Sequence, residues 1–280
     1  MTATISQEER HLLVERRNGV LILTMNRPAA RNALSPQMLV LMAEAWHEFQ
    51  DSKDLHVAIL TGAGAEDFCA GGDLKLTMPL ITGARKPEDE WDHRLVSDLT
   101  QFTDAILRGY DLYKPVIAAV NGNALGGGSE LTNACDLRVA SENAVFGMPE
   151  AKVGLLPGGG SISRLPRQIP YAKAMEMLLI GGSFDAQQAL EMGLLNYVVP
   201  LEELMDKALE MARLIMSRGP GAVARVKLSV RRGFDMDLDN ACEVEADQFG
   251  LAITGDEHKE GMNAFLERRT PEFKDRAGPL

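Results

Sequence analysis

Four short runs of apolar residues constrain the fold of this chain more than any other feature of its sequence. They span residues 20–25, 57–61, 116–120 and 137–140, and segments with helical apolar spacing lie between them. Short apolar runs bounded by polar or turn-forming residues are typical of buried strands. Strands that alternate with helices at this length are typical of right-handed crossover connections. The sequence therefore predicts an α/β fold.

One helix is expected directly after the first of these strands. Ser35 suits the N-cap position and Pro36 the first helical position, where proline loses no hydrogen bond. The apolar residues that follow recur at helical spacing, namely Leu39, Met42, Ala43, Trp46 and Phe49. After Pro200 the pattern changes to successive helices, so we expect an α/β core over residues 1–200 and a helical region over residues 201–280.

Composition narrows the setting of the protein. The 280 residues, of which 45% are hydrophobic, suffice for one large core. A formal net charge of -11 disfavours a general affinity for nucleic acid, since phosphate binding usually needs a basic surface. No apolar stretch reaches the roughly 18 residues expected of a membrane span. We expect a soluble protein with no nucleic-acid or membrane partner.

The cysteines and histidines suggest neither a disulfide framework nor a metal site. The cysteines are odd in number, and neither residue type shows metal-ligand spacing. We therefore expect a reducing, cytoplasmic location and no bound metal. The residues concerned are Cys69, Cys135, Cys242, His11, His47, His56, His93 and His258.

A glycine-rich stretch with two glutamates carries the candidate chemistry. Glu130 follows three glycines and Ser129, and Glu150 follows the sequence FGMP. A strand-to-helix junction here would leave the N–H of Gly127 or Gly128 unpaired in the first helical turn, at the positive end of the helix dipole. A second donor of this kind is expected in FCAGGDL, at Gly71 or Gly72. Two such donors beside paired carboxylates indicate proton transfer next to a carbonyl.

Other interpretations of these residues stay open at this point. A triple glycine also marks tight turns and close helix packing, and either glutamate alone could be a solvated surface charge. Several other glycine motifs are excluded, because the chain has no Gly-Lys-Ser/Thr phosphate loop and no dinucleotide fingerprint. Ser129 is not in a Gly-x-Ser-x-Gly elbow, which disfavours a serine hydrolase.

Five motifs, taken together and in order, resemble the enoyl-CoA hydratase (crotonase) family. They are NRPAARNALS, FCAGGDL, NGNALGGGSEL, FGMPEAKVGLLPGGG and EGMNAFLERRTPEFKDR, and the similarity runs from about residue 12 to residue 276. The resemblance implies a crotonase-like (ClpP/crotonase) fold, with a spiral core of repeated ββα units and a C-terminal helical region. It also implies a homotrimer or a dimer of trimers, formed through the C-terminal helices.

The resemblance also implies a reaction. Glu130 and Glu150 fall on the positions of the general base and the general acid of hydratases in this family. Gly72 and Gly127 match the positions whose backbone N–H groups hold the thioester oxygen. The implied activity is addition of water to a 2-enoyl-CoA thioester. An alternative within the family is a Δ3,Δ2-enoyl-CoA isomerase or another enzyme acting on CoA thioesters, and a further one is a relative that binds RNA.

No tightly bound cofactor is implied, because coenzyme A enters as part of the substrate. The resemblance places its binding at Ala30 and Arg31, with Ala70, Asp73 and Leu74 around FCAGGDL. In the C-terminal tail, Phe265 and Arg268 match an aromatic and a basic residue that often come from a neighbouring subunit. The alternative for these two is a core aromatic residue and a solvated charge.

The chain departs from compact members of the family between Asp73 and Lys114, where it is about ten residues longer. Met78, Pro79, Ile81 and Trp91 lie in this segment. The extra length could shape the acyl pocket, form a mobile lid or be a tolerated surface insertion. His93 also lies here and could be a base, but no partner motif accompanies it.

Overall fold

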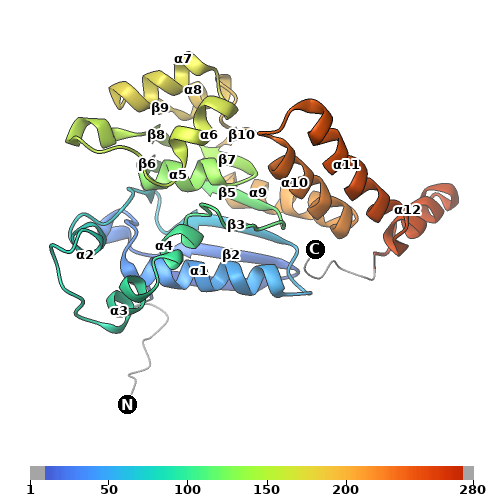
Figure 1. Ribbon diagram of the computed structural model, residues 1–280, viewed down its shortest axis with the longest axis horizontal. Coiled ribbons are helices and arrows are strands. Elements are labelled where there is room, and N and C mark those ends of the chain that lie inside the picture. The colour runs from blue at the N-terminus through green and yellow to red at the C-terminus, as the bar shows by residue number, and fades with distance from the viewer. Residues whose placement is uncertain (1–9, 274–280) are drawn as a thin grey trace.

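The computed structural model describes residues 10–273 and contains two sheets with helices around them (Figure 1). The larger sheet has the strand order β1-β2-β3-β5-β7-β10, and the smaller one has the order β4-β6-β8-β9. In the larger sheet only β1 is antiparallel to its neighbour, and in the smaller sheet only β9 is. The strands of the larger sheet are β1 (Leu12–Arg17), β2 (Val20–Met25), β3 (Val57–Gly62), β5 (Val116–Val120), β7 (Leu137–Ser141) and β10 (Tyr197–Val199).

The four apolar runs form the central strands of the larger sheet, as predicted. Their side chains point alternately to two buried faces, which explains why the runs are apolar throughout. Leu21 and Leu23 of β2 pack toward helix α1 (Pro36–Asp51), while Val20 and Ile22 pack toward α9 (Leu204–Met216). The sheet is therefore covered by α1 on one face and by α9 on the other.

Helix α1 begins where the sequence indicates. The Ser35 hydroxyl accepts a hydrogen bond from the Met38 N–H at 3.2 Å, and Pro36 is the first helical residue. The apolar face of the helix includes Trp46 and Phe49, both fully buried. The N-cap prediction is confirmed.

Three of the four short strands of the smaller sheet follow a longer strand of the larger one. The smaller sheet contains β4 (Asp67–Cys69), β6 (Asn123–Leu125), β8 (Val145–Gly147) and β9 (Ser183–Asp185). The pairs β3–β4, β5–β6 and β7–β8 step in succession around the molecule, and helix α5 (Gly127–Ala134) follows β6 directly. This is the repeated ββα arrangement that the sequence predicts.

The longer segment after Asp73 is folded against the core. It contains α2 (Thr77–Ile81), α3 (Glu90–Ser97) and α4 (Thr100–Ala105). The Trp46 indole N–H of α1 donates to the Ala105 carbonyl at 3.1 Å, and Leu80 and Leu95 are buried in the main core. These contacts disfavour the interpretation of the whole segment as a tolerated surface insertion.

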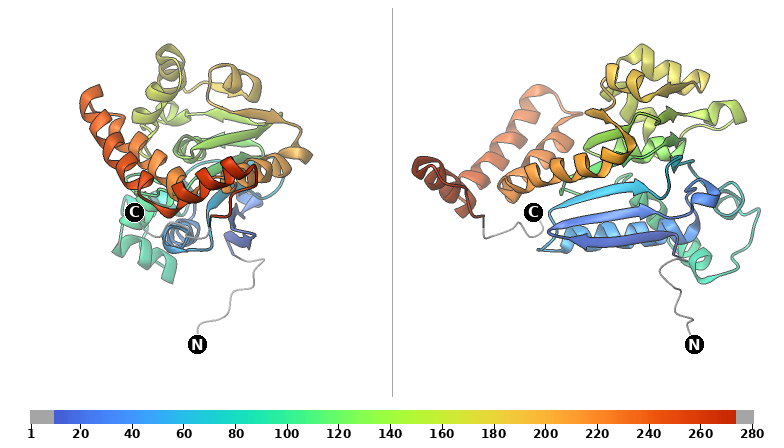
Figure 2. Two further views of the ribbon diagram at one scale, coloured as in Figure 1. Left: turned by 90° about the vertical axis from the view of Figure 1, so that its right-hand side faces the viewer. Right: turned by 180° about the vertical axis from the view of Figure 1, so that it is seen from behind.

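Described residues after β10 are helical, apart from turns and an extended stretch at Thr270–Phe273. The later helices α10 (Pro220–Gly233), α11 (Leu238–Ile253) and α12 (Asp256–Glu267) extend away from the sheets (Figures 1 and 2). Because α9 packs on the larger sheet, the division at residue 200 stays a prediction. The last seven residues of the predicted helical region, 274–280, lie outside the described part. No helix in the described part is long and apolar enough to cross a membrane.

The remaining helical elements are short. They are the 3₁₀ helices η2 (Pro28–Ala30), η3 (Pro149–Val153) and η5 (Leu201–Glu203), the π-helical turn η4 (Glu176–Ile180), and the α-helices α6 (Ser161–Gln168), α7 (Tyr171–Met175) and α8 (Ala186–Glu191).

A contact between α5 and β4 leaves no room for a side chain at Gly128. A Cβ added there would lie 2.0 Å from the Cys69 carbonyl oxygen. We expect Gly128→Ala to lower the free energy of unfolding by about 2–4 kcal/mol, because helix and strand would have to separate.

Gly250→Ala is the matched control, since Gly250 also lies inside a helix but a Cβ there would meet nothing within 4 Å. This change should stabilise the protein by up to about 1 kcal/mol through helix propensity. Denaturant unfolding measures both, and equal stability of the two variants would contradict the backbone contact.

Candidate functional site

Three parallel strands of the smaller sheet end at one edge, and each is followed by a candidate residue. Gly72 follows β4, Gly127 follows β6 and Glu150 follows β8. Because β4, β6 and β8 are parallel neighbours, their carboxyl ends meet at this edge. Residues that are distant in the sequence are thereby brought together.

The amides of Gly72 and Gly127 lie side by side. A Cβ added to Gly127 would lie 3.4 Å from the Gly72 nitrogen, and one added to Gly71 would lie 3.0 Å from the Gly127 nitrogen. Leu34 bonds to the groups on either side of the Gly72 N–H, donating to the Gly71 carbonyl and accepting from the Asp73 N–H. Within residues 10–273, neither the Gly72 nor the Gly127 N–H has a hydrogen-bond acceptor. The pair is suited to hold one anionic oxygen.

Glu130 lies one turn along α5 from Gly127, and its side chain is buried. Its Oε1 accepts hydrogen bonds from the Gly159 N–H at 2.6 Å and the Ser161 N–H at 3.3 Å. Burial raises the pKa of Glu130 above the ordinary value, although these two amides act in the opposite direction. A carboxylate with a raised pKa binds a proton more tightly than an ordinary glutamate does, and this property suits a general base.

Glu150 lies in the 3₁₀ helix η3 and borders the same backbone. A Cβ on Gly126 would lie 2.9 Å from Glu150 Oε1, and Gly126 has a φ of 53° that favours glycine. Burial raises the pKa of Glu150, and the negative charge of Glu130 raises it further. The effect of Glu130 on the pKa of Glu150 shows that the two carboxylates lie close enough for their charges to interact.

Glu150 Oε2 is buried and has no hydrogen-bond partner in the described part of the chain. A buried carboxyl oxygen without a partner is costly as an anion and less costly when protonated. A protonated Glu150 beside an ionised Glu130 would give the site one acid and one base. A reaction that removes a proton from one atom and delivers a proton to a nearby carbon needs such a base and such an acid.

The coenzyme A positions expected near Gly72 also lie together. Ala30 ends η2 after β2, and the Arg31 carbonyl accepts from the Ala70 N–H at 3.0 Å. Leu74 is 76% exposed beside them. The bond between Arg31 and Ala70 places η2 beside the segment that carries Gly72.

Two charged residues of this group already have partners within the chain. The Arg31 guanidinium donates to the Asp67 carboxylate at 2.7 Å. Asp73 accepts from Arg27 at 2.8 Å and from the N–H groups of Lys75 and Leu76 at 2.9 Å each. The Asp73 carboxylate therefore organises the turn before α2, while the exposed Arg31 side chain faces solvent.

Phe265 and Arg268 are not brought to this site within one chain. They lie at the end of α12, across the molecule from α2 (Figure 1). Phe265 is 78% exposed, so the alternative of a core aromatic residue does not apply to the single chain. Their role toward coenzyme A stays a prediction.

Sequence reasoning missed the turn that holds Glu130. The turn consists of residues 158–160, and Ser161 begins α6 directly after it. The sequence signal was a third glycine run before a helix, of the same kind as residues 126–128. It also missed that Met78 lies against Gly72: its Sδ would be 3.3 Å from a Cβ on Gly72.

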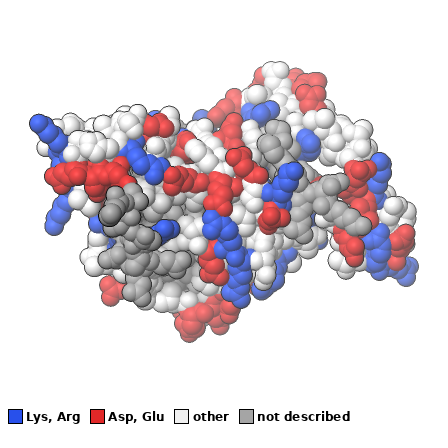
Figure 3. Space-filling model, turned by 90° about the horizontal axis from the view of Figure 1, so that it is seen from below, with Lys and Arg blue, Asp and Glu red and all other residues white. Residues whose placement is uncertain are grey.

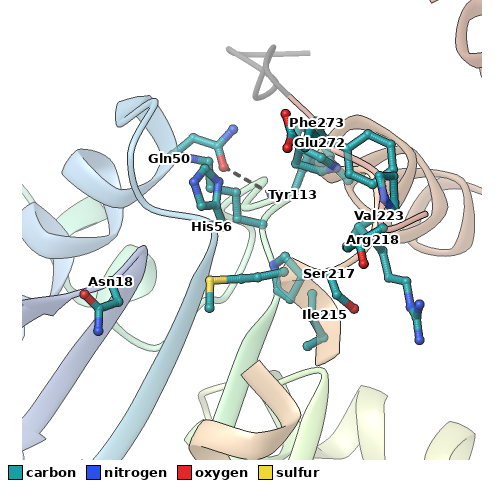
Figure 4. A pocket seen from close by; sticks show the side chains of 17 residues that line it. Asn18, Gln50, His56, Tyr113, Ile215, Ser217, Arg218, Val223, Glu272 and Phe273 are labelled. Carbon is teal, nitrogen blue, oxygen red and sulfur yellow. Dashed lines mark hydrogen bonds between the residues drawn. The ribbon is translucent and has the colours of Figure 1, made fainter. Parts of the chain in front are cut away.

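Other candidate sites lie elsewhere or are absent from the described residues. A cavity of about 430 Å³ near the start of β3 is lined by His56, Gln50 and Tyr113, among others, but not by Glu130 or Glu150 (Figure 4). His93 is exposed on α3, in agreement with a solvated histidine. No cluster of three or more metal-binding side chains occurs between residues 10 and 273.

The paired carboxylates beside two free amides form a candidate enzyme site, suited to chemistry next to a carbonyl. The chain belongs to the enoyl-CoA hydratase/isomerase family, whose family model matches residues 15–276. It is 44% identical over 265 residues to the enoyl-CoA hydratase EchA19 of Mycobacterium tuberculosis, covering 94% of this chain and 96% of that one.

Two further comparisons agree. The (E)-benzylidenesuccinyl-CoA hydratase of Thauera aromatica is 39% identical over 257 residues, covering 92% of this chain and 96% of the relative. The crystal structure of an enoyl-CoA hydratase from Bacillus anthracis superposes with a TM-score of 0.85 at 35% identity, covering 95% of this chain and 99% of that one. The family and the crotonase-like fold expected from the sequence are both confirmed.

The raised pKa of Glu150 has a consequence for stability. A carboxyl group whose pKa is higher in the folded than in the unfolded state stabilises the fold at low pH, and this stabilisation is lost as the pH rises through the folded pKa. Glu150→Gln removes the titrating group. We expect the stability of this variant relative to the unmodified protein to increase between about pH 4 and pH 7.

Thermal unfolding across this pH range measures the difference. Glu142→Gln is the matched control, because Glu142 is exposed at the end of β7. A Glu150→Gln difference that stays constant with pH, as the control's should, would contradict the buried environment of Glu150.

Proposed function

We propose that the protein is an enoyl-CoA hydratase that adds water to the double bond of a 2-enoyl-CoA thioester. Glu130 removes a proton from water as the oxygen attacks C3. The Gly72 and Gly127 N–H groups hold the thioester oxygen while it carries the negative charge of the enolate. Glu150 then gives its proton to C2. The single observation that carries this proposal is the placement of two carboxylates with raised pKa beside two adjacent, unpaired amides.

The second carboxylate favours hydration over the alternatives. A Δ3,Δ2-enoyl-CoA isomerase moves one proton and needs one carboxylate, whereas hydration needs both a base and an acid. An RNA-binding role is disfavoured by the net charge of -11. Acidic and basic side chains are also interspersed on the face shown in Figure 3. RNA binding that weakens with salt would revive that alternative.

Coenzyme A would bind at Ala30, Arg31, Ala70, Asp73 and Leu74, with Phe265 and Arg268 supplied by a second copy of the chain. The position of these two residues on α12, far from their own site, supports assembly into a homotrimer or a dimer of trimers. Exposed apolar side chains on the C-terminal helices support it as well, among them Val226, Val230, Phe249 and Phe265. The cytoplasmic location expected from the sequence stays a prediction.

The two carboxylates are tested by Glu130→Gln and Glu150→Gln. Each should lower the rate of crotonyl-CoA hydration by about 10²–10⁴-fold, because each removes one proton-transfer group. Loss of the conjugated thioester absorbance measures hydration, and Glu142→Gln is the control. Near-normal hydration by either variant would reject the assignment, and 3-enoyl-CoA isomerisation that survives in only one of them would move the assignment to the isomerase.

The paired amides are tested by Gly127→Val. The side chain would project toward Gly71, Leu34 and the Gly72 nitrogen, so the oxygen of the substrate would lose its place. We expect kcat to fall by about 10²–10³-fold, the usual cost of one lost donor. Gly182→Val is the control, since a Cβ there meets nothing within 4 Å. A folded Gly127→Val variant with full activity would rule out this use of the amides.

A further inference from the structure

The orientation of Glu130 depends on the turn at residues 158–160. The Gly159 N–H donates to Glu130 Oε1 at 2.6 Å, and a Cβ on Gly159 would lie 2.5 Å from Glu130 Oε2. The carboxylate therefore rests directly on the backbone of the turn. Because the three residues of the turn are glycines, they have no side chains with which to fix their own position.

Two arginine side chains hold this turn by its carbonyl groups. Arg164, on α6, donates to the Gly159 carbonyl at 3.1 Å and to the Leu107 carbonyl at 2.6 Å. Arg108 donates to the Gly158 carbonyl at 2.8 Å. Arg108 and Leu107 belong to the end of the longer segment after Asp73. The two arginines thereby connect that segment to the turn, and the turn to Glu130.

The same arginines supply positive charge near the Glu130 carboxylate. Burial raises the pKa of Glu130, and the amides of Ser161 and Gly159 followed by the charges of Arg164 and Arg108 act against this rise. The charge of Glu130 in turn raises the pKa of Glu150 of η3. Arg231 of α10 acts on Arg164. Without the arginines, less of Glu130 would be ionised at a given pH.

We propose that Arg164 and Arg108 are positioning residues for Glu130, which hold the glycine turn by its carbonyls so that its amides direct the carboxylate toward the reacting water. This inference rests on the proposed role of Glu130 as the general base. Their hydrogen bonds go to the turn and its neighbour Leu107, so both arginines act through Glu130 and not on the substrate.

The test compares Arg164→Met, which removes hydrogen bonds and charge, with Arg164→Lys, which keeps the charge but loses the planar fork of donors. The readout is the pH profile of kcat/KM for crotonyl-CoA hydration. A base works in its ionised form, so a higher pKa moves the acidic limb of the profile to higher pH. We expect Arg164→Met to move the limb up by roughly 0.5–1 pH unit.

Arg164→Lys should leave the limb in place and lower kcat roughly tenfold through a misplaced carboxylate. Arg167→Met is the matched control, since Arg167 lies on the same helix but is exposed and pairs with Asp235. If Arg164→Met does not fold, Arg108→Met takes its place in the test, because Arg108 is exposed. The acidic limb of the Arg108→Met profile should also move to higher pH. An unmoved limb in the deciding variant, with or without a loss of kcat, would indicate at most a structural role and overturn the proposal.

A double-mutant cycle separates this proposal from the proposed function. In the Glu130→Gln background, Arg164→Met should lower the residual rate no further, because the arginine acts through the missing carboxylate. A full additional loss would overturn the positioning role. Near-normal turnover by Glu130→Gln alone would reject the proposed function together with this proposal. An inactive Glu130→Gln variant with unchanged arginine variants would reject only the positioning role.

Discussion

The close approach of the first turn of α5 to the end of β4 is the contact on which the site depends. At Gly128 the backbone of the helix lies against the Cys69 carbonyl, where any Cβ would overlap it. This contact brings the Gly127 and Gly72 amides side by side. The parallel pairing of β6 with β8 then places Glu150 at the same edge, and one helical turn places Glu130. The backbone contact, the strand pairing and the helical turn together fix the relative positions of the four groups.

The two carboxylates differ from the buried charges of the scaffold. Arg138 is also buried, but its guanidinium donates to the carbonyls of Cys135, Leu194 and Asn133. These bonds compensate for the loss of hydration. Glu150 has a buried oxygen without such compensation, and Glu130 has two amides against a larger effect of burial. A buried ionisable group that lacks full compensation is typical of functional sites.

Much of this arrangement could be predicted from the sequence because it depends on local patterns. The four apolar runs identify the central strands, and Ser35 and Pro36 mark the start of α1. The glycine runs and glutamates, with the family resemblance, indicate the candidate site. The strands β8 and β9 have three residues each, and their conformation is set by pairing with distant strands, which leaves no periodic pattern.

The partners of Glu130 could not be predicted for a similar reason. Gly159 follows Glu130 by 29 residues in the sequence, whereas Arg108 precedes Glu130. Such contacts depend on the tertiary packing of α5, α6 and the segment after α4. The fold of that segment was likewise open, since α2, α3 and α4 are short and are buried mainly through contacts with α1 and its core.

The two adjacent unpaired donors, the N–H groups of Gly72 and Gly127, belong to the main chain, whereas Met78, which lies against Gly72, belongs to a separate helical segment. A main-chain donor persists through most side-chain replacements, because only its geometry matters. Side chains of the α2–α4 segment are free to vary without removing that donor pair. Under the proposed function, replacement of side chains in the α2–α4 segment would alter the surroundings of the acyl group and leave the two main-chain donors in place.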